Sequence, residues 1–355
     1  MSTASAVDIP VAPEVAEAAE TVPEKHYTHH AGRGPTVHRT NPVFVQRDIS
    51  SLAVAEGMNV LEIGTGSGYS GALLARLVGP AGQVTSLDVD GYLTRWANLI
   101  HHERGLTTIR CHTADGTAGY PRSGPYDRIG AWCAPPLLPR AWVDQSAADG
   151  RIVSTLPIAP VPDLSVLAHI RVIDGVPTVE GFTGGNYIDA TPAPKADLKV
   201  PGRWIDWEIR TPEHAWVSLA WRERDDWHHS GARATLERLR HPGHTEQARD
   251  ASPSWGAVRC WAAATADPGL TLAQLAPDRM AVGHSTPTSA AALTQDGTIL
   301  ADASDSPSLT ALRAWMTGWE KAGRPATGTF LPRLVAADHG QGLTGWDLRL
   351  SPPEA

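Results

Sequence analysis

The residues best suited to chemistry lie in Val60–Tyr69, which reads VLEIGTGSGY. A short apolar run with an acidic residue leads into three glycines spaced G-x-G-x-G, and helical apolar spacing follows. A strand–loop–helix turn of this kind brings backbone amides close to a nucleotide-like ligand. The spacing differs from the G-x-G-x-x-G of dinucleotide folds. It therefore indicates S-adenosylmethionine as cofactor, and methyl transfer as the reaction.

Acidic residues follow the next two predicted strands. Asp88 follows Gln83–Leu87 and can accept both hydroxyls of a ribose, while Asp115-Gly116 comes after Ile109–His112 and suits an adenine ring. Glu62, at the foot of the loop, is a candidate partner for the cofactor's ammonium group. Taken alone, Asp88 fits a helix N-cap and Asp115 a turn, but open α/β sheets bind ligands at the carboxyl ends of strands. The predicted cofactor-binding residues are Glu62, Gly64, Thr65, Gly66, Ser67, Gly68, Asp88, Asp115 and Gly116.

The elements that must position these residues alternate between strand and helix over residues 58–182. This alternation predicts an α/β fold with a Rossmann-like, doubly wound, mostly parallel sheet. Ser165–Ile173 and Thr178–Phe182 lie close in sequence, so we expect an antiparallel hairpin at one edge. The predicted helices are Ser70–Val78, Tyr92–Arg104 and Pro139–Ser146.

A length of 355 residues suggests two domains. Residues 1–25 are rich in Ala, Val, Pro and Glu, and we interpret them as a mobile tail. The proline-rich residues 189–202 predict a linker between a methyltransferase domain over residues 26–188 and a smaller α+β domain over residues 203–355. The C-terminal domain would have an accessory or substrate-binding role, and its tryptophans fit either a peptide-binding surface or core packing: Trp204, Trp207, Trp216 and Trp221.

The composition limits which classes of binding partner we expect. The formal net charge is −8, which gives no electrostatic reason to bind nucleic acid or an anionic membrane. We find no apolar run of membrane-spanning length and no signal peptide, and the three cysteines lack paired spacing, so we expect a cytoplasmic protein. The adjacent histidine pairs have no cysteine partner and no His-Glu-x-x-His spacing, so no metal is predicted. The oligomeric state is not predicted.

Four sequence segments together resemble a known family. Val60–Tyr69, Ala114–Pro121, Tyr126–Ile129 and Ala134–Pro139 occur in this order. Together they resemble the protein-L-isoaspartate O-methyltransferase family over roughly residues 36–185. The resemblance implies a class I methyltransferase fold, S-adenosylmethionine as cofactor, and methyl esterification of a carboxylate in a peptide.

The same resemblance implies a substrate site before the first strand of the sheet. In the family, a Ser-x-x-Ser-x-Pro-like segment places its second hydroxyl beside the reacting carboxylate. Thr40 falls on that hydroxyl position, whereas Val37 replaces the first serine. Thr40 also fits a simple turn before Asn41-Pro42. The resemblance implies Thr40 as catalytic residue, and Asn41 beside it is a candidate substrate contact. Arg39 or His38 is a candidate to pair with the negative charge of the substrate.

The extension beyond residue 202 resembles that of actinobacterial relatives which esterify an aspartate in ribosomally made lanthipeptides, lasso peptides or graspetides. There the ester collapses to a succinimide (aspartimide). We therefore expect a constrained peptide, such as a cyclic or crosslinked one, as the substrate. The alternatives are repair of L-isoaspartyl residues in damaged proteins, a small-molecule O-methyltransferase, and a peptide-binding protein that keeps a vestigial cofactor fold.

Overall fold

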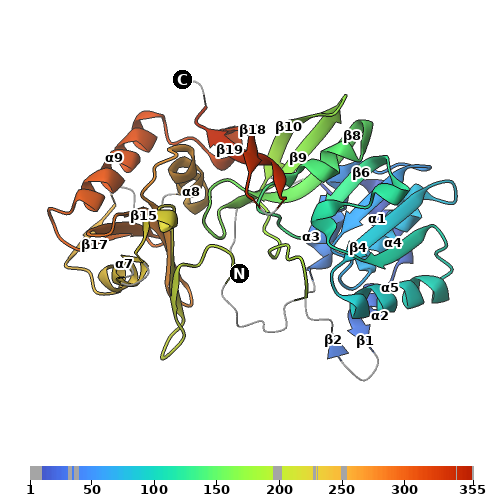
Figure 1. The fold of residues 1–355 in the computed structure, drawn as a ribbon, viewed down its shortest axis with the longest axis horizontal. Coiled ribbons are helices and arrows are strands. Elements are labelled where there is room, and N and C mark those ends of the chain that lie inside the picture. Colours follow the sequence, from blue (N-terminus) through green and yellow to red (C-terminus); the bar gives the residue numbers. More distant parts are fainter. Residues whose placement is uncertain are drawn as a thin grey trace.

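The chain is described by a computed structural model, which covers residues 10–30, 34–35, 40–194, 202–226, 229, 231–248, 254–340 and 342–353. Two lobes face each other in Figure 1, each built around a seven-stranded sheet. The C-terminal strands lie between them. We call the lobes the first lobe and the second lobe, in chain order.

The sheet of the first lobe is mostly parallel. Its strand order is β10-β9-β8-β6-β3-β4-β5, with parallel pairing from β8 to β5 and antiparallel pairing of β8 with β9 and of β9 with β10. This is the class I methyltransferase fold with the antiparallel edge predicted from the sequence. The strands are β3 (Asn59–Ile63), β4 (Gln83–Asp88), β5 (Ile109–Thr113), β6 (Tyr126–Ala131), β8 (Ser146–Pro157), β9 (Ser165–Ile173) and β10 (Val176–Thr183).

Helices cover this sheet and begin and end at recognisable signals. Helix α5 follows the N-cap Asp90, whose carboxylate accepts from the Tyr92 N–H at 2.7 Å, and Gly105 lies just beyond its end at a φ of 67°. Because both faces of the sheet are covered, β3 is buried along nearly its whole length. The helices of this lobe are α1 (Pro13–Thr21), α2 (Glu24–Thr28), α3 (Pro42–Leu52), α4 (Tyr69–Val78), α5 (Gly91–Glu103) and α6 (Arg140–Asp144).

The predicted mobile tail over residues 1–25 is wrong for residues 13–22. Helix α1 packs against α3 and α4, and Val15, Ala18 and Val22 are buried in the same core as α4. Val15 and Ala18 lie three residues apart on one face of α1, and Val22 follows directly after the helix. The prediction weighed the composition of the segment and overlooked this spacing.

The sheet of the second lobe is antiparallel throughout, in the order β11-β12-β14-β15-β16-β17-β13. Helix α7 (Gly231–Arg240) packs on one face, while α8 (Trp255–Ala264) and α9 (Pro307–Lys321) pack on the other. Trp216 and Trp221 are buried, so both serve the core. The strands are β11 (Trp207–Ile209), β12 (Ala215–Leu219), β13 (His244–Gln247), β14 (Leu270–Ala276), β15 (Arg279–Ser285), β16 (Ala290–Thr294) and β17 (Thr298–Ala301).

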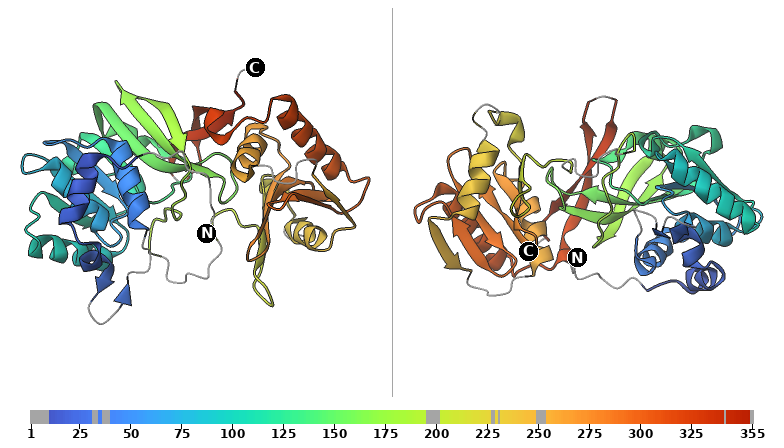
Figure 2. Two further views of the ribbon diagram at one scale, coloured as in Figure 1. Left: turned by 180° about the vertical axis from the view of Figure 1, so that it is seen from behind. Right: turned by 90° about the horizontal axis from the view of Figure 1, so that it is seen from below.

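The C-terminal hairpin joins the two lobes. Strands β18 (Leu331–Asp338) and β19 (Thr344–Ser351) form a three-stranded sheet with β7 (Leu138–Pro139) of the first lobe. The contact requires Gly345, because a Cβ there would lie 1.9 Å from the Leu138 carbonyl oxygen. Figure 2 shows the hairpin between the lobes from below. The predicted domain over residues 203–355 thus reaches the first lobe through its last two strands.

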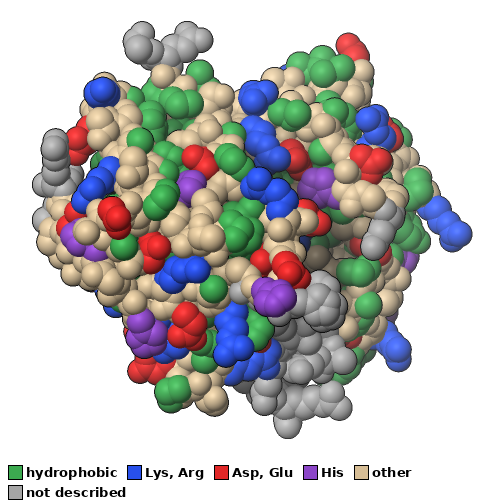
Figure 3. Space-filling view, turned by 60° about the vertical axis from the view of Figure 1, so that its left-hand side comes forward, with side chains coloured by type: hydrophobic (Ala, Val, Ile, Leu, Met, Phe, Trp, Pro, Cys, Tyr) green, Lys and Arg blue, Asp and Glu red, His purple; other side chains and the backbone are tan. Residues whose placement is uncertain are grey.

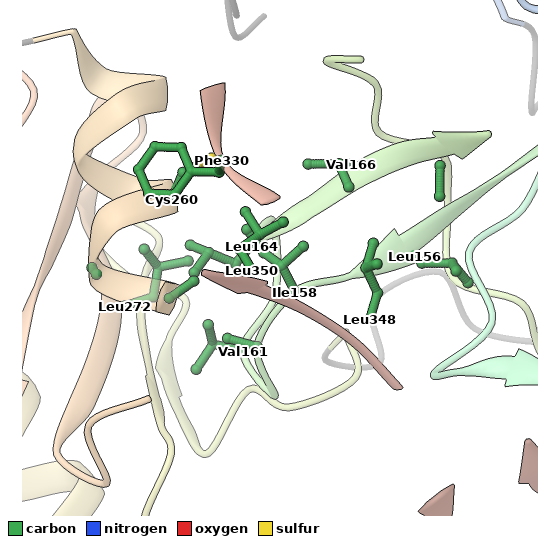
Figure 4. Packing of buried hydrophobic residues seen from close by; sticks show 14 of the residues in the cluster. Leu156, Ile158, Val161, Leu164, Val166, Cys260, Leu272, Phe330, Leu348 and Leu350 are labelled. Atoms are coloured by element: carbon green, nitrogen blue, oxygen red, sulfur yellow. The ribbon is translucent and has the colours of Figure 1, made fainter. Parts of the chain in front are cut away.

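A continuous core runs through this junction. Figure 4 shows Leu348 and Leu350 of β19 beside Ile158 and Leu164 of the first lobe, with Cys260 of α8 nearby. All five side chains are at most 5% exposed. The lobes are thus packed against each other through apolar side chains and do not simply hang on a linker.

The surface carries side chains of both charges. On the face drawn in Figure 3, Lys and Arg side chains are interspersed with Asp and Glu side chains. Within the described residues, no helix combines the length and the apolar character needed to cross a bilayer.

Candidate active site

A cavity of about 770 Å³ opens at the carboxyl edge of the first sheet. The ends of β3 and β4, the turn after β5 and the residues after β6 all contribute to its lining. Most of the predicted cofactor residues meet there, as expected for an open α/β sheet. The predicted residues that line it are Thr40, Gly64, Thr65, Gly66, Ser67, Asp88, Asp115 and Gly116.

The glycine loop is held in a conformation that suits glycine. Gly64, Gly66 and Gly68 have φ values of 94°, 51° and 86°, in the left-handed region that strains other residues. The loop is fixed to β4 by the Gly64 N–H and the Thr65 N–H, which donate to the Leu87 carbonyl at 2.8 and 3.1 Å.

Helix α4 starts directly after this loop. Gly68 is its N-cap and lies just behind the cavity lining, and it has no side chain that could bond the amides of the first turn. Ser67 accepts from the Tyr69 N–H at 3.3 Å. A helix N-terminus with amides left for a ligand favours an anionic group such as a carboxylate.

Asp88 is oriented by the backbone around it. One carboxylate oxygen accepts from the Gly66 N–H and the other from the Asp90 N–H, both at 2.9 Å. Each carboxylate oxygen can accept more than one hydrogen bond. The side chain is thereby set in the cavity wall in an orientation that suits ribose hydroxyls.

Asp115 and Gly116 form the next part of the wall. Asp115 accepts from the N–H and the hydroxyl of Thr117 at 2.9 and 2.8 Å, so it also has the turn role that the sequence left open. A Cβ on Gly116 would lie 2.3 Å from Ile63, and the Gly116 carbonyl accepts from the Trp142 indole at 2.8 Å. Glycine is required because this turn packs directly on the end of β3.

Glu62 does not contact the cavity, and the predicted bond to the cofactor's ammonium group is wrong. The side chain is fully buried behind the loop, where it accepts from the Ser86 hydroxyl at 2.6 Å and the Trp132 indole at 2.9 Å. Burial raises the pKa of Glu62, although these hydrogen bonds oppose the increase. Ser86 in turn bonds Thr65 at 2.7 Å, so Glu62 supports the loop from behind.

The predicted substrate residues divide into three groups. Thr40 is half-buried and lines the cavity just before α3. Asn41 is exposed and caps α3, because its side-chain oxygen accepts from the Val43 N–H at 3.0 Å. It does not line the cavity. His38 and Arg39 lie outside the described residues.

Sequence reasoning missed a wall formed by residues 186–191. The Tyr187 hydroxyl donates to Asp48 of α3 at 2.7 Å, and Arg47 donates to the same carboxylate at 2.6 Å. Burial raises the pKa of both Asp48 and Tyr187. The pair Gly184-Gly185 before Asn186 was the one signal that the chain turns back toward the site here.

This wall overlaps the predicted linker over residues 189–202, which is therefore wrong at its start. The Ala134 N–H donates to the Ile188 carbonyl at 2.7 Å, and the Ala190 N–H donates to the Ala134 carbonyl at 2.9 Å. Residues 195–201 lie outside the described residues.

The remaining lining offers no metal site and no activated thiol. Across the described ranges, no cluster of three or more His, Cys, Asp or Glu is arranged to hold a metal ion. Cys133 lines the cavity, but burial raises the pKa of its thiol to about 12. Since a thiolate is the nucleophilic form, Cys133 is inert at neutral pH.

The fold and the cavity define a class I S-adenosylmethionine-dependent methyltransferase. The family described as protein-L-isoaspartate(D-aspartate) O-methyltransferase matches residues 10–175. A protein-L-isoaspartate O-methyltransferase of Anaeromyxobacter dehalogenans (strain 2CP-C) is 35% identical over 167 residues, 46% of this chain and 77% of the relative. Another, of Methanosarcina mazei, is 35% identical over 122 residues, 34% of this chain and 49% of the relative. The chain belongs to the protein-L-isoaspartate O-methyltransferase family.

A solved structure extends the likeness to both lobes. A chain named protein-L-isoaspartate O-methyltransferase matches 96% of this chain and 95% of its own length, with a TM-score of 0.50 and 15% sequence identity. This likeness concerns the fold alone.

S-adenosylmethionine is the cofactor of this family, and the cavity fits it. Its amino acid end suits the start of α4, its ribose suits Asp88, and its adenine suits Asp115 and Gly116. The bound cofactor supplies a methyl group activated on a sulfonium.

Proposed function

We propose that the chain methylates the carboxylate of an L-isoaspartyl residue in a polypeptide, the reaction for which its family is named. One observation carries the proposal: Thr40 lines the same cavity as the glycine loop and Asp88. A hydroxyl that can hold a carboxylate thus lies at the cavity that suits the methyl donor.

The reaction needs no general base. A side-chain carboxylate ordinarily has a pKa of about 4 and is ionised at neutral pH. One of its oxygens forms the bond to the methyl carbon as the carbon–sulfur bond breaks, and no proton moves. Holding the reacting atoms in line at roughly 3 Å can supply several kcal/mol of the rate enhancement.

The residues of the chain then act by positioning. The Thr40 hydroxyl donates to the carboxylate oxygen that does not react. Strong pairing with a cation would weaken the nucleophile, so one neutral hydroxyl is a suitable partner. Buried apolar side chains of the lining, among them Val45, Ile63 and Leu87, keep water from the reacting oxygen.

The test compares an isoaspartyl peptide with its aspartyl counterpart. Each is incubated with the enzyme and S-adenosylmethionine, and mass spectrometry follows the gain of one methylene. We expect an ester on the isoaspartyl peptide, with turnover reduced in Thr40→Val and retained in Thr40→Ser. Absence of ester on both peptides would contradict the proposal.

The sequence before α3 favours a second candidate, esterification of an aspartate in a ribosomally made, constrained peptide. Val37 stands where the repair enzymes have a serine, which suggests a different substrate. A neighbouring backbone nitrogen would attack the methyl ester, expel methanol and close a succinimide. A gain of one methylene followed by a net loss of one water in such a peptide, with no ester on an isoaspartyl peptide, would favour this candidate.

A further inference from the structure

A second recess, of about 380 Å³, adjoins the cofactor cavity. Residues 186–189 line both, so this short segment separates the two spaces. The first lobe supplies one wall of the recess, and the second lobe supplies the other through Trp204, Trp216 and Gln274. The volume lies in the range of ligand pockets, ~300–1,000 Å³.

The dividing segment is fixed to both lobes. Asp189 accepts from the Arg203 guanidinium at 2.6 Å and from the Arg203 N–H at 3.0 Å. The same guanidinium donates to the Ala134 carbonyl at 2.6 Å. Because Tyr187 is bonded to Asp48 at 2.7 Å, the wall is also held from the side of the cofactor cavity. The recess is therefore a built feature of the junction.

The second lobe directs an available donor to this recess. The Gln274 side-chain oxygen accepts from the Trp216 indole at 2.9 Å, and no described residue bonds its amide nitrogen. That nitrogen is also accessible to solvent. Pairing with β15 shifts register directly after Gln274, an irregularity of the kind that re-aims side chains.

Two non-glycine residues of the lining have left-handed backbone conformations. The φ values are 68° for Trp204 and 57° for Asp163. Such a conformation in a bulky residue costs on the order of 1–3 kcal/mol and persists only where its surroundings impose it. Trp204 is held by Arg203, whose guanidinium carbon lies 4.9 Å from the ring centroid.

The charges of the recess favour a neutral occupant. Asp189 already pairs with Arg203, and Asp163 accepts from the Asn186 amide at 2.9 Å. An anionic ligand would meet two carboxylates as well as the Arg203 guanidinium, whose Nε and Nη1 are buried without a partner among the described residues. A peptide group instead offers a carbonyl to Gln274 without adding charge. A polypeptide that enters the neighbouring cavity brings such peptide groups with it.

We propose that the recess binds the segment of the substrate polypeptide next to the methylated residue, with a backbone carbonyl accepting from Gln274. The first lobe then performs the chemistry, and the second lobe helps to select the substrate. This inference rests on the proposed function, because it requires a polypeptide substrate.

Gln274→Glu is a sharp test. Glutamate keeps an oxygen for the Trp216 indole but replaces the donor with a charged acceptor. Gln247→Glu makes the same chemical change at an exposed position in β13, an edge strand of the same sheet that is separated from β14 by three strands. Two isoaspartyl peptides are compared, one with a single residue on each side of the isoaspartate and one extended by several uncharged residues.

In Gln274→Glu we expect KM for the extended peptide to rise about tenfold. KM for the short peptide, kcat, and the Kd of S-adenosylhomocysteine should stay unchanged, and Gln247→Glu should match the wild type throughout. A melting temperature equal to wild type confirms folding. Equal effects on both peptides, or no effect on either, would overturn the inference.

Calorimetry separates this inference from the proposed function. Peptide binding is measured in the presence of S-adenosylhomocysteine, so no methyl transfer is needed. The extended peptide should bind the wild type more tightly than the short one, and Gln274→Glu should remove the difference. Tight binding without esterification would overturn the proposed function alone. Equal binding of the two peptides would overturn the inference that the recess binds the substrate.

Discussion

Two sheets of seven strands place their chemistry very differently. In the first lobe the central strands are parallel, so their carboxyl ends meet at one edge and bring Gly64, Asp88 and Asp115 to one cavity. In the second lobe every pairing is antiparallel, so consecutive strands end at opposite edges. Where this lobe borders the first one, Trp216 and Gln274 of its sheet line the recess, together with Trp204. Strand direction thus explains why one lobe holds the cofactor motifs and the other offers a wall.

The strongest test of this difference is removal of Asp88. We expect Asp88→Ala to weaken S-adenosylhomocysteine binding roughly 100-fold, since two charge-assisted hydrogen bonds contribute about 3 kcal/mol or more. Calorimetry measures the Kd. Asp278→Ala, an exposed position in the second lobe, is the matched control and should bind as the wild type does. Equal affinity of Asp88→Ala and the wild type would remove Asp88 from the cofactor site.

Acid stability tests a buried histidine of the first lobe. His101 of α5 is 1% exposed, and neither of its ring nitrogens has a partner in the part of the chain that the structure describes. Burial lowers its pKa to about 4. Unfolded chains take up this proton near pH 6.5, so His101 costs the folded state up to about 3 kcal/mol as pH falls from about 6.5 to about 4. His101→Phe should abolish this loss in urea unfolding at pH 7 and pH 4.5. If His101→Phe loses as much stability as the exposed control His102→Phe, the assignment fails.

A smaller effect is expected at Thr40, which belongs to the reaction and not to cofactor binding. Thr40→Ala should lower kcat about tenfold, the equivalent of one neutral hydrogen bond of about 1–1.5 kcal/mol. The Kd of S-adenosylhomocysteine should not change. Thr40→Ser keeps the hydroxyl and serves as the control. Unchanged turnover in Thr40→Ala would leave Thr40 as a turn residue only.

The smallest effect concerns the second lobe alone. The Ser306 hydroxyl accepts from the Leu309 N–H at 3.4 Å and caps α9. Ser306→Ala should lower the free energy of unfolding by about 1 kcal/mol, as is typical of a lost N-cap. Thr310→Ala, at an exposed position in the same helix, should change it by less than about 0.5 kcal/mol. A change in cofactor affinity in Ser306→Ala would contradict the division of roles between the lobes.

Features encoded within a few residues were predictable from the sequence. The loop Gly64–Gly68 and the strands before Asp88 and Asp115 are local, because glycine, apolar runs and turn residues determine them without distant partners.

Features that depend on distant partners were not predictable. Tyr187 reaches the site through Asp48, 139 residues earlier in the chain, and β19 pairs with β7 across about two hundred residues. Glu62 was misjudged because its type and position suited a ligand, whereas the burial that removes it from the cavity comes from Ser86 and Trp132. One sequence alone carries no signal for such pairings.

A structure with bound S-adenosylhomocysteine tests the account most directly. We predict the ribose hydroxyls on Asp88, the adenine beside Asp115, and the sulfur facing Thr40 across the space left for a carboxylate. A ligand bound elsewhere, or a sulfur directed away from Thr40, would contradict the central claim that the parallel sheet and the segment before α3 together form a carboxyl methyltransferase site.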